Sequence, residues 1–262
     1  MGESASVEVG GKRRPSITPP LQRIADRCAL FLDFDGTLMN LEPRPDQVAV
    51  DGCLLYLLDD LYVATAGAVA VFSGRGLKDL DTLLTPLRLP AAGIHGAQRR
   101  RADGSIEKLE LPPTLVWRTR MALRVRLRHY TGLFVEDKGC AFAVHYRGAS
   151  RLSVARLRVD MQALAGASGG VYEVLEGTDV LELRPHGCDT GTALASFMSE
   201  PPFAGRLPIF LGDEHSDLAG FDAVARLNGI GIAVGPRVQA PWWLPDPVAV
   251  RAWLRGCLEL GL

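Results

Sequence analysis

Apolar residues in this chain follow two patterns, short continuous runs and longer stretches with helical spacing. The short runs are too brief for helices and rich in strand-forming residues, which predicts buried strands. These runs cover residues 30–32, 68–72, 208–211 and 229–235. In residues 54–61 and 77–84, leucines recur mainly every three or four residues, which predicts helices after the first two strands. Strands that alternate with helices indicate an α/β fold with a parallel sheet.

A different order occupies residues 112–185. There, an arginine-rich helical stretch is followed by two strand-like runs, a second helical stretch and two more strand-like runs. The runs of each pair are separated by Asp137-Lys138-Gly139 or Gly177-Thr178-Asp179, which are turn signals typical of hairpins. Because the buried-strand pattern resumes afterwards, we predict a compact α+β unit inserted into the core. The predicted core comprises residues 21–111 and 186–262, and the polar, Gly- and Pro-containing residues 1–20 are predicted to form a flexible tail.

The composition is that of an ordinary globular protein, with 47% hydrophobic and 23% charged residues among 262. A net charge of −1 provides no broad electrostatic attraction for nucleic acid or an anionic membrane. The five cysteines are scattered and form no Cys-x-x-Cys pair, which favours reduced thiols over a disulfide framework or a zinc site. No segment has the apolar length of a signal peptide or a membrane span. These features predict a cytoplasmic protein, expected to be a monomer, with no nucleic-acid or membrane partner.

Acidic residues directly follow two of the predicted strands. Asp33 and Asp35 come after the run 30–32, and they should point to the same side with Phe34 opposite, because side chains alternate along an extended strand. Residues 212–217, Gly-Asp-Glu-His-Ser-Asp, follow the run 208–211. Since parallel strands end at one edge of a sheet, the two clusters can share a hard cation such as Mg²⁺. The alternative is a pair of solvated turns, because Asp, Gly and Thr are ordinary turn residues.

Ser73-Gly74-Arg75 follows the second predicted strand and precedes a helix. The serine hydroxyl, the backbone amides and the helix N-terminus of such a segment can all donate hydrogen bonds to a phosphate group. An ordinary strand-to-helix turn would show the same pattern. His95 is flanked by glycines at positions 93 and 96, where a ligand could approach closely, although a lone histidine is commonly structural.

The segment Asp33-Phe-Asp35-Gly-Thr, placed after a hydrophobic strand, resembles the first motif of the haloacid dehalogenase-like phosphohydrolases. This resemblance implies that Asp33 attacks phosphorus to form an aspartyl-phosphate, and that Asp35 is the general acid and then the general base. A carboxylate nucleophile splits the displacement into two steps, and an acid relieves the charge on the leaving oxygen. Ser-Gly-Arg resembles the second motif, which implies that Ser73 binds the transferred phosphoryl group with Gly74 and Arg75 in the same site.

Further markers resemble the trehalose-6-phosphate phosphatase family within this superfamily. They are Gly-Ile-His-Gly-Ala at 93–97, Glu136-Asp-Lys138, His145-Tyr-Arg147, Glu-Leu-Arg-Pro at 182–185, and Gly-Asp-Glu at 212–214 with Asp217 and Phe221. The resemblance implies a Rossmann-like parallel-sheet core with a mobile α+β cap that closes over the sugar. It also implies Mg²⁺-dependent hydrolysis of trehalose 6-phosphate, with substrate contacts from His95, Glu136, Lys138, Arg147 and Glu182. The implied Mg²⁺ site comprises Asp33, the Asp35 carbonyl and Asp213, with Asp217 in support.

The chain departs from the family pattern at two positions. Thr190 takes the place of the third-motif lysine, and Thr178 that of a lysine in the second hairpin. Thr190 stays among the predicted substrate-binding residues, but threonine carries no positive charge, so we expect weaker electrostatic stabilisation of phosphoryl transfer. The cations that could compensate are Arg75, Lys138, Arg147 and Arg184. Two other functions stay open: a weakened protein that binds trehalose 6-phosphate without rapid turnover, and a phosphatase of another sugar phosphate such as sucrose phosphate.

Overall fold

The structure is a computed structural model that describes residues 18–20, 27–42 and 47–260. Apart from residues 18–20, the predicted flexible tail lies outside these ranges, as do residues 43–46. Within the described part of the chain, no helix is both long and apolar enough to cross a membrane.

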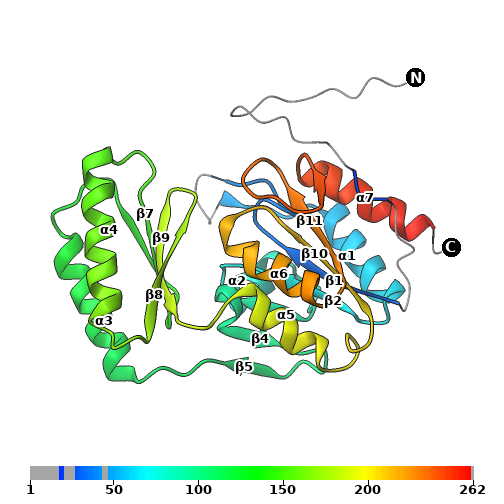
Figure 1. Ribbon diagram of the computed structural model, residues 1–262, viewed down its shortest axis with the longest axis horizontal. Helices are drawn as coiled ribbons and strands as arrows, with labels where there is room; N and C mark the ends of the chain where they lie inside the picture. The colour runs from blue at the N-terminus through cyan, green and yellow to red at the C-terminus, as the bar shows by residue number, and fades with distance from the viewer. Residues whose placement is uncertain (1–17, 21–26, 43–46, 261–262) are drawn as a thin grey trace.

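The larger of two sheets has eight strands in the order β12-β11-β10-β1-β2-β3-β4-β5 (Figure 1). Strands β12 to β3 in this order are parallel, whereas β4 and β5 are antiparallel additions at one edge. Their bounds are β1 Cys28–Asp33, β2 Val69–Phe72, β3 Ala91–Gly93, β4 Gln98–Arg100, β5 Ile106–Lys108, β10 Leu207–Gly212, β11 Ile230–Val234 and β12 Trp242–Leu244. The apolar runs therefore predicted the longer strands, while β3, β4, β5 and β12, with three residues each, are too short to show a pattern.

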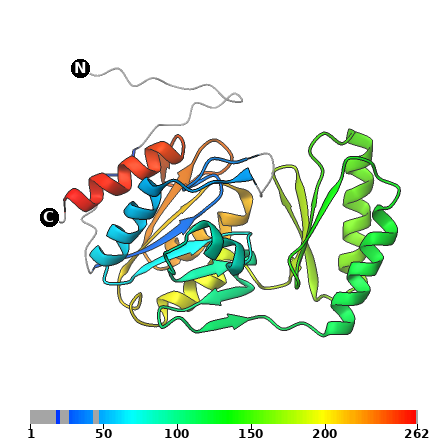
Figure 2. The ribbon, with the colours of Figure 1, turned by 180° about the vertical axis from the view of Figure 1, so that it is seen from behind.

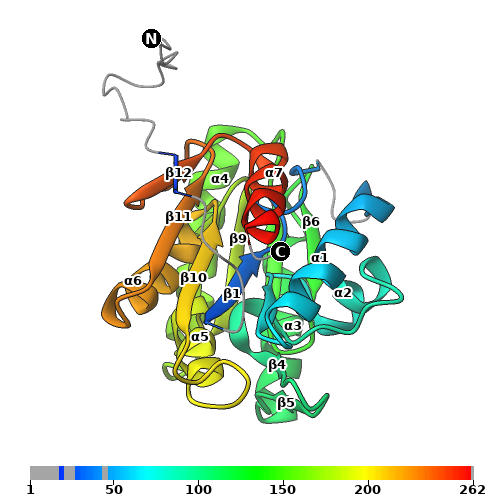
Figure 3. The same ribbon diagram turned by 90° about the vertical axis from the view of Figure 1, so that its right-hand side faces the viewer.

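Helices cover both faces of this sheet (Figure 3). The helices α1 Gly52–Ala64, α2 Leu77–Leu83 and α7 Pro247–Glu259 bury their apolar residues on one face with Leu30 and Leu32 of β1. On the other face, α5 Thr190–Met198 and α6 Leu218–Arg226 pack with Phe31. The alternation along β1 thus supplies both hydrophobic cores, which makes β1 the central strand of the fold.

Side-chain caps begin α1 and α7. The Asp51 carboxylate accepts a hydrogen bond of 2.8 Å from the backbone N–H of Leu54, and Asp246 accepts one of 2.8 Å from that of Ala249. Each bond satisfies an amide that has no partner within the helix.

A second, antiparallel sheet of four strands has the order β6-β7-β9-β8. Its strands are β6 Phe134–Asp137, β7 Phe142–His145, β8 Tyr172–Gly177 and β9 Val180–Pro185. The helices α3 Pro113–Leu127 and α4 Arg151–Gly166 cover its outer face with a separate apolar cluster (Figures 1 and 2). Its inner face is turned towards the large sheet. The predicted class, an α/β parallel-sheet core with an inserted α+β part, is confirmed, and the domain boundaries at residues 112 and 185 stay a prediction.

Candidate active site

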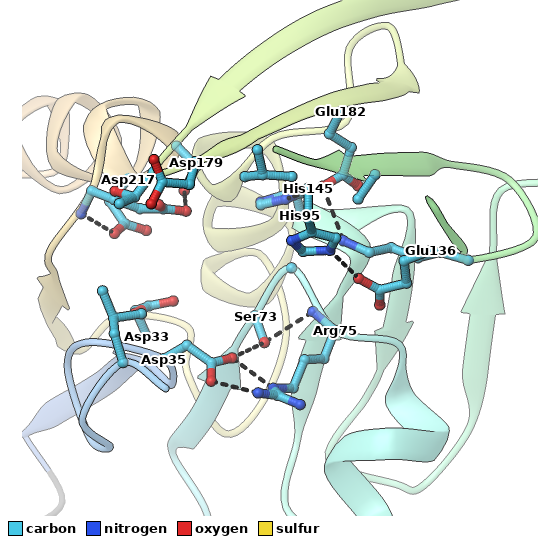
Figure 4. A pocket seen from close by; sticks show the side chains of 18 of the residues that line it. Asp33, Asp35, Ser73, Arg75, His95, Glu136, His145, Asp179, Glu182 and Asp217 are labelled. Atoms are coloured by element: carbon cyan, nitrogen blue, oxygen red, sulfur yellow. Dashed lines mark hydrogen bonds and ion pairs between the residues drawn. The ribbon is translucent and has the colours of Figure 1, made fainter. Parts of the chain in front are cut away.

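The strand order brings three predicted site segments to one edge of the large sheet. Strand β1 lies between β10 and β2, with Asp33 in register with Phe72 and Leu32 with Leu211. Asp33, which ends β1, is therefore beside Ser73 after β2 and Asp213 after β10. This edge opens into a pocket whose other wall is the inner face of the second sheet (Figure 4). The arrangement follows the rule that ligands of open α/β sheets bind at the carboxyl ends of the strands.

A buried acidic cluster occupies this edge. Asp33, Asp213 and Asp217 each offer a carboxylate oxygen, and these oxygens lie within 4.8 Å of one another. The Asp217 carboxylate is fixed by the backbone N–H groups of Asp213 and Glu214, at 2.9 and 3.1 Å. Gly36 lies against the cluster, since a Cβ there would be 2.2 Å from Asp213 Oδ2. The cluster is thus held rigidly by backbone contacts.

The carboxylates of this cluster disfavour one another's ionisation. Burial, together with the charges of Asp217 and Asp213, raises the pKa of Asp33 well above its ordinary value. Burial likewise raises the pKa of Asp217, with repulsion from Asp213 and Glu214. Burial raises the pKa of Asp213 to about 6, although a nearby guanidinium opposes this shift. A bound cation would relieve this repulsion.

The cluster fits a hard divalent cation. Asp33 Oδ2 and Asp217 Oδ1 are buried and have no hydrogen-bond partner among the described residues. Buried carboxylate oxygens without partners are costly, and oxygen ligands gathered in this way are what Mg²⁺ prefers. The prediction of Asp33 and Asp213 as metal ligands agrees with this geometry. Asp217, predicted in support only, belongs to the cluster, whereas the Asp35 carboxylate does not.

The Asp35 carboxylate instead pairs with Arg75. The guanidinium donates from Nε to Asp35 Oδ2 at 2.7 Å and from Nη2 to Oδ1 at 2.8 Å. Ser73 Oγ donates to Asp35 Oδ2 at 3.5 Å and accepts from the backbone N–H of Arg75 at 3.0 Å. Asp33 and Asp35 both line the pocket while Phe34 is fully buried in the core, which matches the alternation predicted from sequence.

His95 has an unusual backbone conformation beside this segment. Its φ is 52° and that of Ile94 is 51°, in the left-handed region that favours glycine. Strained residues of this kind are common at ligand sites. A Cβ at Gly74 would come within 2.9 Å of His95 Nε2, so the absence of a side chain at Gly74 permits the close approach of the imidazole. Both residues line the pocket.

The second sheet contributes the opposite wall. Glu136, Ala143 and Glu182 are aligned across β6, β7 and β9, so that two carboxylates flank a small side chain. Lys138 Nζ donates to Glu182 Oε2 at 2.9 Å, and His95 Nε2 lies 3.3 Å from the same oxygen. Burial alone would raise the pKa of Glu182, but Lys138 and His95 outweigh it and lower the pKa to about 2. Glu182 therefore joins the second sheet to the core as an ionised carboxylate.

Removal of Lys138 should be strongly destabilising. Lys138 and Glu182 are 9% and 5% exposed, so a Lys138→Met variant leaves a buried carboxylate without its charge partner. We expect its free energy of unfolding, measured in urea at pH 7, to fall by roughly 3–5 kcal/mol.

The matched control for Lys138→Met is Arg147→Gln. It breaks the half-exposed pair of Arg147 with Asp179, which is 3.1 Å long, and should cost less than about 1 kcal/mol. Equal losses in the two variants would contradict the assignment of a buried, interdependent pair.

Thr190 lines the pocket, but its hydroxyl forms hydrogen bonds with backbone groups. Thr190 Oγ1 donates to the carbonyl of Ser216 at 3.0 Å and accepts from the backbone N–H of Gly220 at 3.0 Å. Next to it, a Cβ at Gly191 would come within 2.4 Å of the Ala219 carbonyl. The start of α5 is therefore fastened to the first turn of α6 and to Ser216 just before it, and a direct role of Thr190 in substrate binding stays a prediction.

All predicted substrate-binding residues line the pocket, together with several that the sequence did not single out as site residues. The additional residues are Leu41, Glu42, Ala143, His145, Thr178, Asp179, Val180, Glu214, Ser216 and Asp217. His145 and Asp217 lie in motifs that the sequence displays. Arg237, which contacts Asp213, is a lone basic residue in a Gly-Pro-Arg loop, and no pattern in the sequence connects it to the site.

The whole pocket lies within a stretch that matches known proteins. A sequence model of the family described as Trehalose-phosphatase matches residues 31–241. The trehalose-6-phosphate phosphatase of Escherichia coli strain K12 is 38% identical over 245 residues, which cover 91% of this chain and 90% of that protein. A probable trehalose-phosphate phosphatase of Sinorhizobium fredii is 41% identical over 215 residues, covering 82% of this chain and 80% of that one. A crystal structure of a trehalose-6-phosphate phosphatase related protein has a TM-score of 0.74 at 26% identity, with 89% of this chain and 98% of that chain covered.

Proposed function

The chain belongs to the trehalose-phosphatase family, and we propose that it hydrolyses trehalose 6-phosphate through an aspartyl-phosphate on Asp33. The products are trehalose and inorganic phosphate. The observation that carries the mechanism is the placement of Asp33 in a buried acidic cluster beside the separate Asp35–Arg75 pair, opposite a wall of sugar-compatible polar groups. Such divergent environments of two neighbouring carboxylates suit one nucleophile and one acid or base.

Asp33, the Asp35 carbonyl and Asp213, supported by Asp217, would hold Mg²⁺. When bound, Mg²⁺ offsets the charge of the carboxylates and of the phosphoryl oxygens. Without such a cation, burial and the neighbouring carboxylates raise the pKa of Asp33 and so disfavour its ionised, nucleophilic form.

In the first step, one oxygen of Asp33 forms a bond to phosphorus while the bond from phosphorus to the sugar oxygen breaks. Asp35, protonated and released from its ion pair with Arg75, would pass its proton to this leaving oxygen, so trehalose departs neutral. In the second step, Asp35 takes a proton from water as the water oxygen attacks phosphorus, which releases phosphate and restores Asp33. Ser73 Oγ, 3.5 Å from Asp35, would donate to a phosphoryl oxygen.

The second sheet would bind the sugar. A disaccharide presents many hydroxyl groups, and ionised carboxylates such as Glu136 and Glu182 accept hydrogen bonds from them strongly. Lys138 and His95 hold Glu182 in place, and His145 lies 3.0 Å from Glu136 Oε2. Arg147 also lines the pocket. The cytoplasmic location and the monomeric state stay proposals from the sequence.

The test is phosphate release from a panel of trehalose 6-phosphate, sucrose 6-phosphate and glucose 6-phosphate, with Mg²⁺ and with EDTA. We expect kcat/KM to be at least about a hundredfold higher for trehalose 6-phosphate, because buried polar groups reject ligands that leave them unpaired. EDTA should abolish turnover.

In one contrary outcome, the wild type releases no phosphate and yet is stabilised against heat by trehalose 6-phosphate, while a Thr190→Lys variant is active. That result would contradict the proposed enzymatic activity and indicate a binding protein. A higher kcat/KM for sucrose 6-phosphate would instead contradict the proposed substrate.

A further inference from the structure

The pocket has many more carboxylates than cationic side chains. Its described lining residues include eight carboxylates and three lysine or arginine side chains. The three cations are each paired with a carboxylate of the same pocket: Arg75 with Asp35, Lys138 with Glu182, and Arg147 with Asp179. A phosphate group that carries two negative charges would therefore meet a repulsive environment beside the acidic cluster.

Arg237 reaches this cluster from the loop between β11 and β12. Its Nη2 donates to Asp213 Oδ2, and its Nε lies 3.5 Å from the Asp213 carbonyl oxygen. From the same guanidinium, Nη1 donates to Thr178 Oγ1 at 3.4 Å. Arg237 thus contacts both the core cluster and the hairpin of the second sheet that closes the pocket.

Neither of the two threonines supplies charge to this region. The Thr190 hydroxyl is occupied by backbone groups, and Thr178 accepts a hydrogen bond from Arg237. Among the described residues, one basic side chain, that of Arg237, forms an ion pair with a member of the cluster. The positive charge therefore comes from the loop between β11 and β12, and not from positions 178 and 190, where the family pattern has lysines.

The start of this loop is held by hydrogen bonds that do not involve the Arg237 side chain. The backbone N–H of Gly235 donates to the Leu244 carbonyl at 2.9 Å, and Trp243 Nε1 donates to the Gly235 carbonyl at 2.7 Å. The Arg237 side chain is 32% exposed, whereas its partner Asp213 is 2% exposed. An exposed guanidinium that points inward onto a buried carboxylate is better explained by its charge than by packing.

We propose that Arg237 is the counter-ion of the Asp33, Asp213 and Asp217 cluster. It competes with the divalent cation for Asp213 Oδ2, and its charge lowers the repulsion between the cluster and the substrate phosphate. The inference rests on the proposed phosphatase function and deepens it. Because a cation repels Mg²⁺ and attracts phosphate, its removal must change the two affinities in opposite directions.

The test compares Arg237→Gln and Arg237→Lys with the wild type by titration calorimetry. Mg²⁺ is titrated into metal-free protein, and inorganic phosphate into protein saturated with Mg²⁺. For Arg237→Gln we expect Mg²⁺ to bind about fivefold more tightly and phosphate about fivefold more weakly, a change typical of one partly exposed charge. KM for trehalose 6-phosphate should rise by a similar factor, and Arg237→Lys should restore most of each change.

The control is Arg126→Gln, which removes one positive charge and the 3.0 Å pair with Asp160 on the outer helices. It should leave both affinities unchanged. Unchanged affinities in Arg237→Gln, or a parallel loss of both, would overturn the proposal, because a merely structural role predicts no opposite shifts. Neither titration requires turnover, so a wild type that fails to hydrolyse trehalose 6-phosphate would overturn the proposed function separately.

Discussion

An Asp33→Asn variant should lose at least about 10⁴-fold in kcat, because an amide cannot attack phosphorus. The same variant should be more stable than the wild type when metal is absent, by about 1–3 kcal/mol at pH 8, a range typical of relieving one uncompensated buried group. The reason is that Asp33, Asp213 and Asp217 repel one another within 4.8 Å in a buried cluster. Activity and urea denaturation in EDTA are the measurements.

The gain in stability should depend on pH. Burial and neighbouring charges raise the pKa of Asp33 in the folded state. At pH values between the pKa of Asp33 in the unfolded chain and this raised pKa, the folded protein therefore binds more protons than the unfolded chain. The stability of the metal-free wild type must therefore fall as the pH rises through this window. The advantage of Asp33→Asn should be largest at pH 8 and small near pH 4.

The control for Asp33→Asn is Asp59→Asn, an exposed aspartate on α1. It should keep full activity and change stability by less than about 0.5 kcal/mol. A metal-free Asp33→Asn protein that is less stable than the wild type at pH 8 would show that the cluster is not under electrostatic strain.

A Gly36→Ala variant should disrupt the cation site. Gly36 has a φ of +93°, and a Cβ there would lie 2.2 Å from Asp213 Oδ2 and 2.7 Å from Oδ1. Because this contact is too short to exist, the Asp213 carboxylate would have to leave the position in which it is buried and paired with Arg237. We expect kcat to fall at least about a hundredfold, as for other displacements near 1 Å in an active site. Calorimetric Mg²⁺ binding should weaken in parallel.

Gly104→Ala separates this clash from backbone strain. Gly104 has a similar φ of +83°, but nothing lies within 4 Å of its added Cβ. Both variants should lose about 1–2 kcal/mol of stability from the left-handed conformation, and Gly104→Ala should retain Mg²⁺ binding and activity. Equal activity in the two variants would show that the close approach at Gly36 is not needed.

Much of the fold could be predicted because its strands carry their own signal. Strand β1 is buried on both faces and sends Leu30 and Leu32 into one core and Phe31 into the other, so the apolar run is continuous. The caps at Asp51 and Asp246 are local, since each side chain bonds an amide three residues ahead. By contrast, the strand β12 pairs, among the described residues, with β11 alone, and a segment of three residues is too short to show a period of its own.

The sequence by itself predicted which residues gather at the edge of the sheet. The rule that polar groups directly after buried strands face a ligand crevice points to Asp33, Asp35, Ser73 and Asp213, and their chemical roles, which the family resemblance implies, stay predictions. The sequence also shows threonine at positions 178 and 190, where the family pattern has two positively charged lysines.

Only the tertiary structure decided how these groups pair. Arg75 holds Asp35, Lys138 holds Glu182 from the turn after β6, and Arg237 reaches Asp213 from a loop 24 residues away along the chain. Charge pairing depends on distance in space, and a basic side chain in a loop carries no periodic signal that reports its partner. The missing positive charge was therefore visible in the sequence, whereas its replacement by Arg237 became visible only when the strand order placed β11 next to β10.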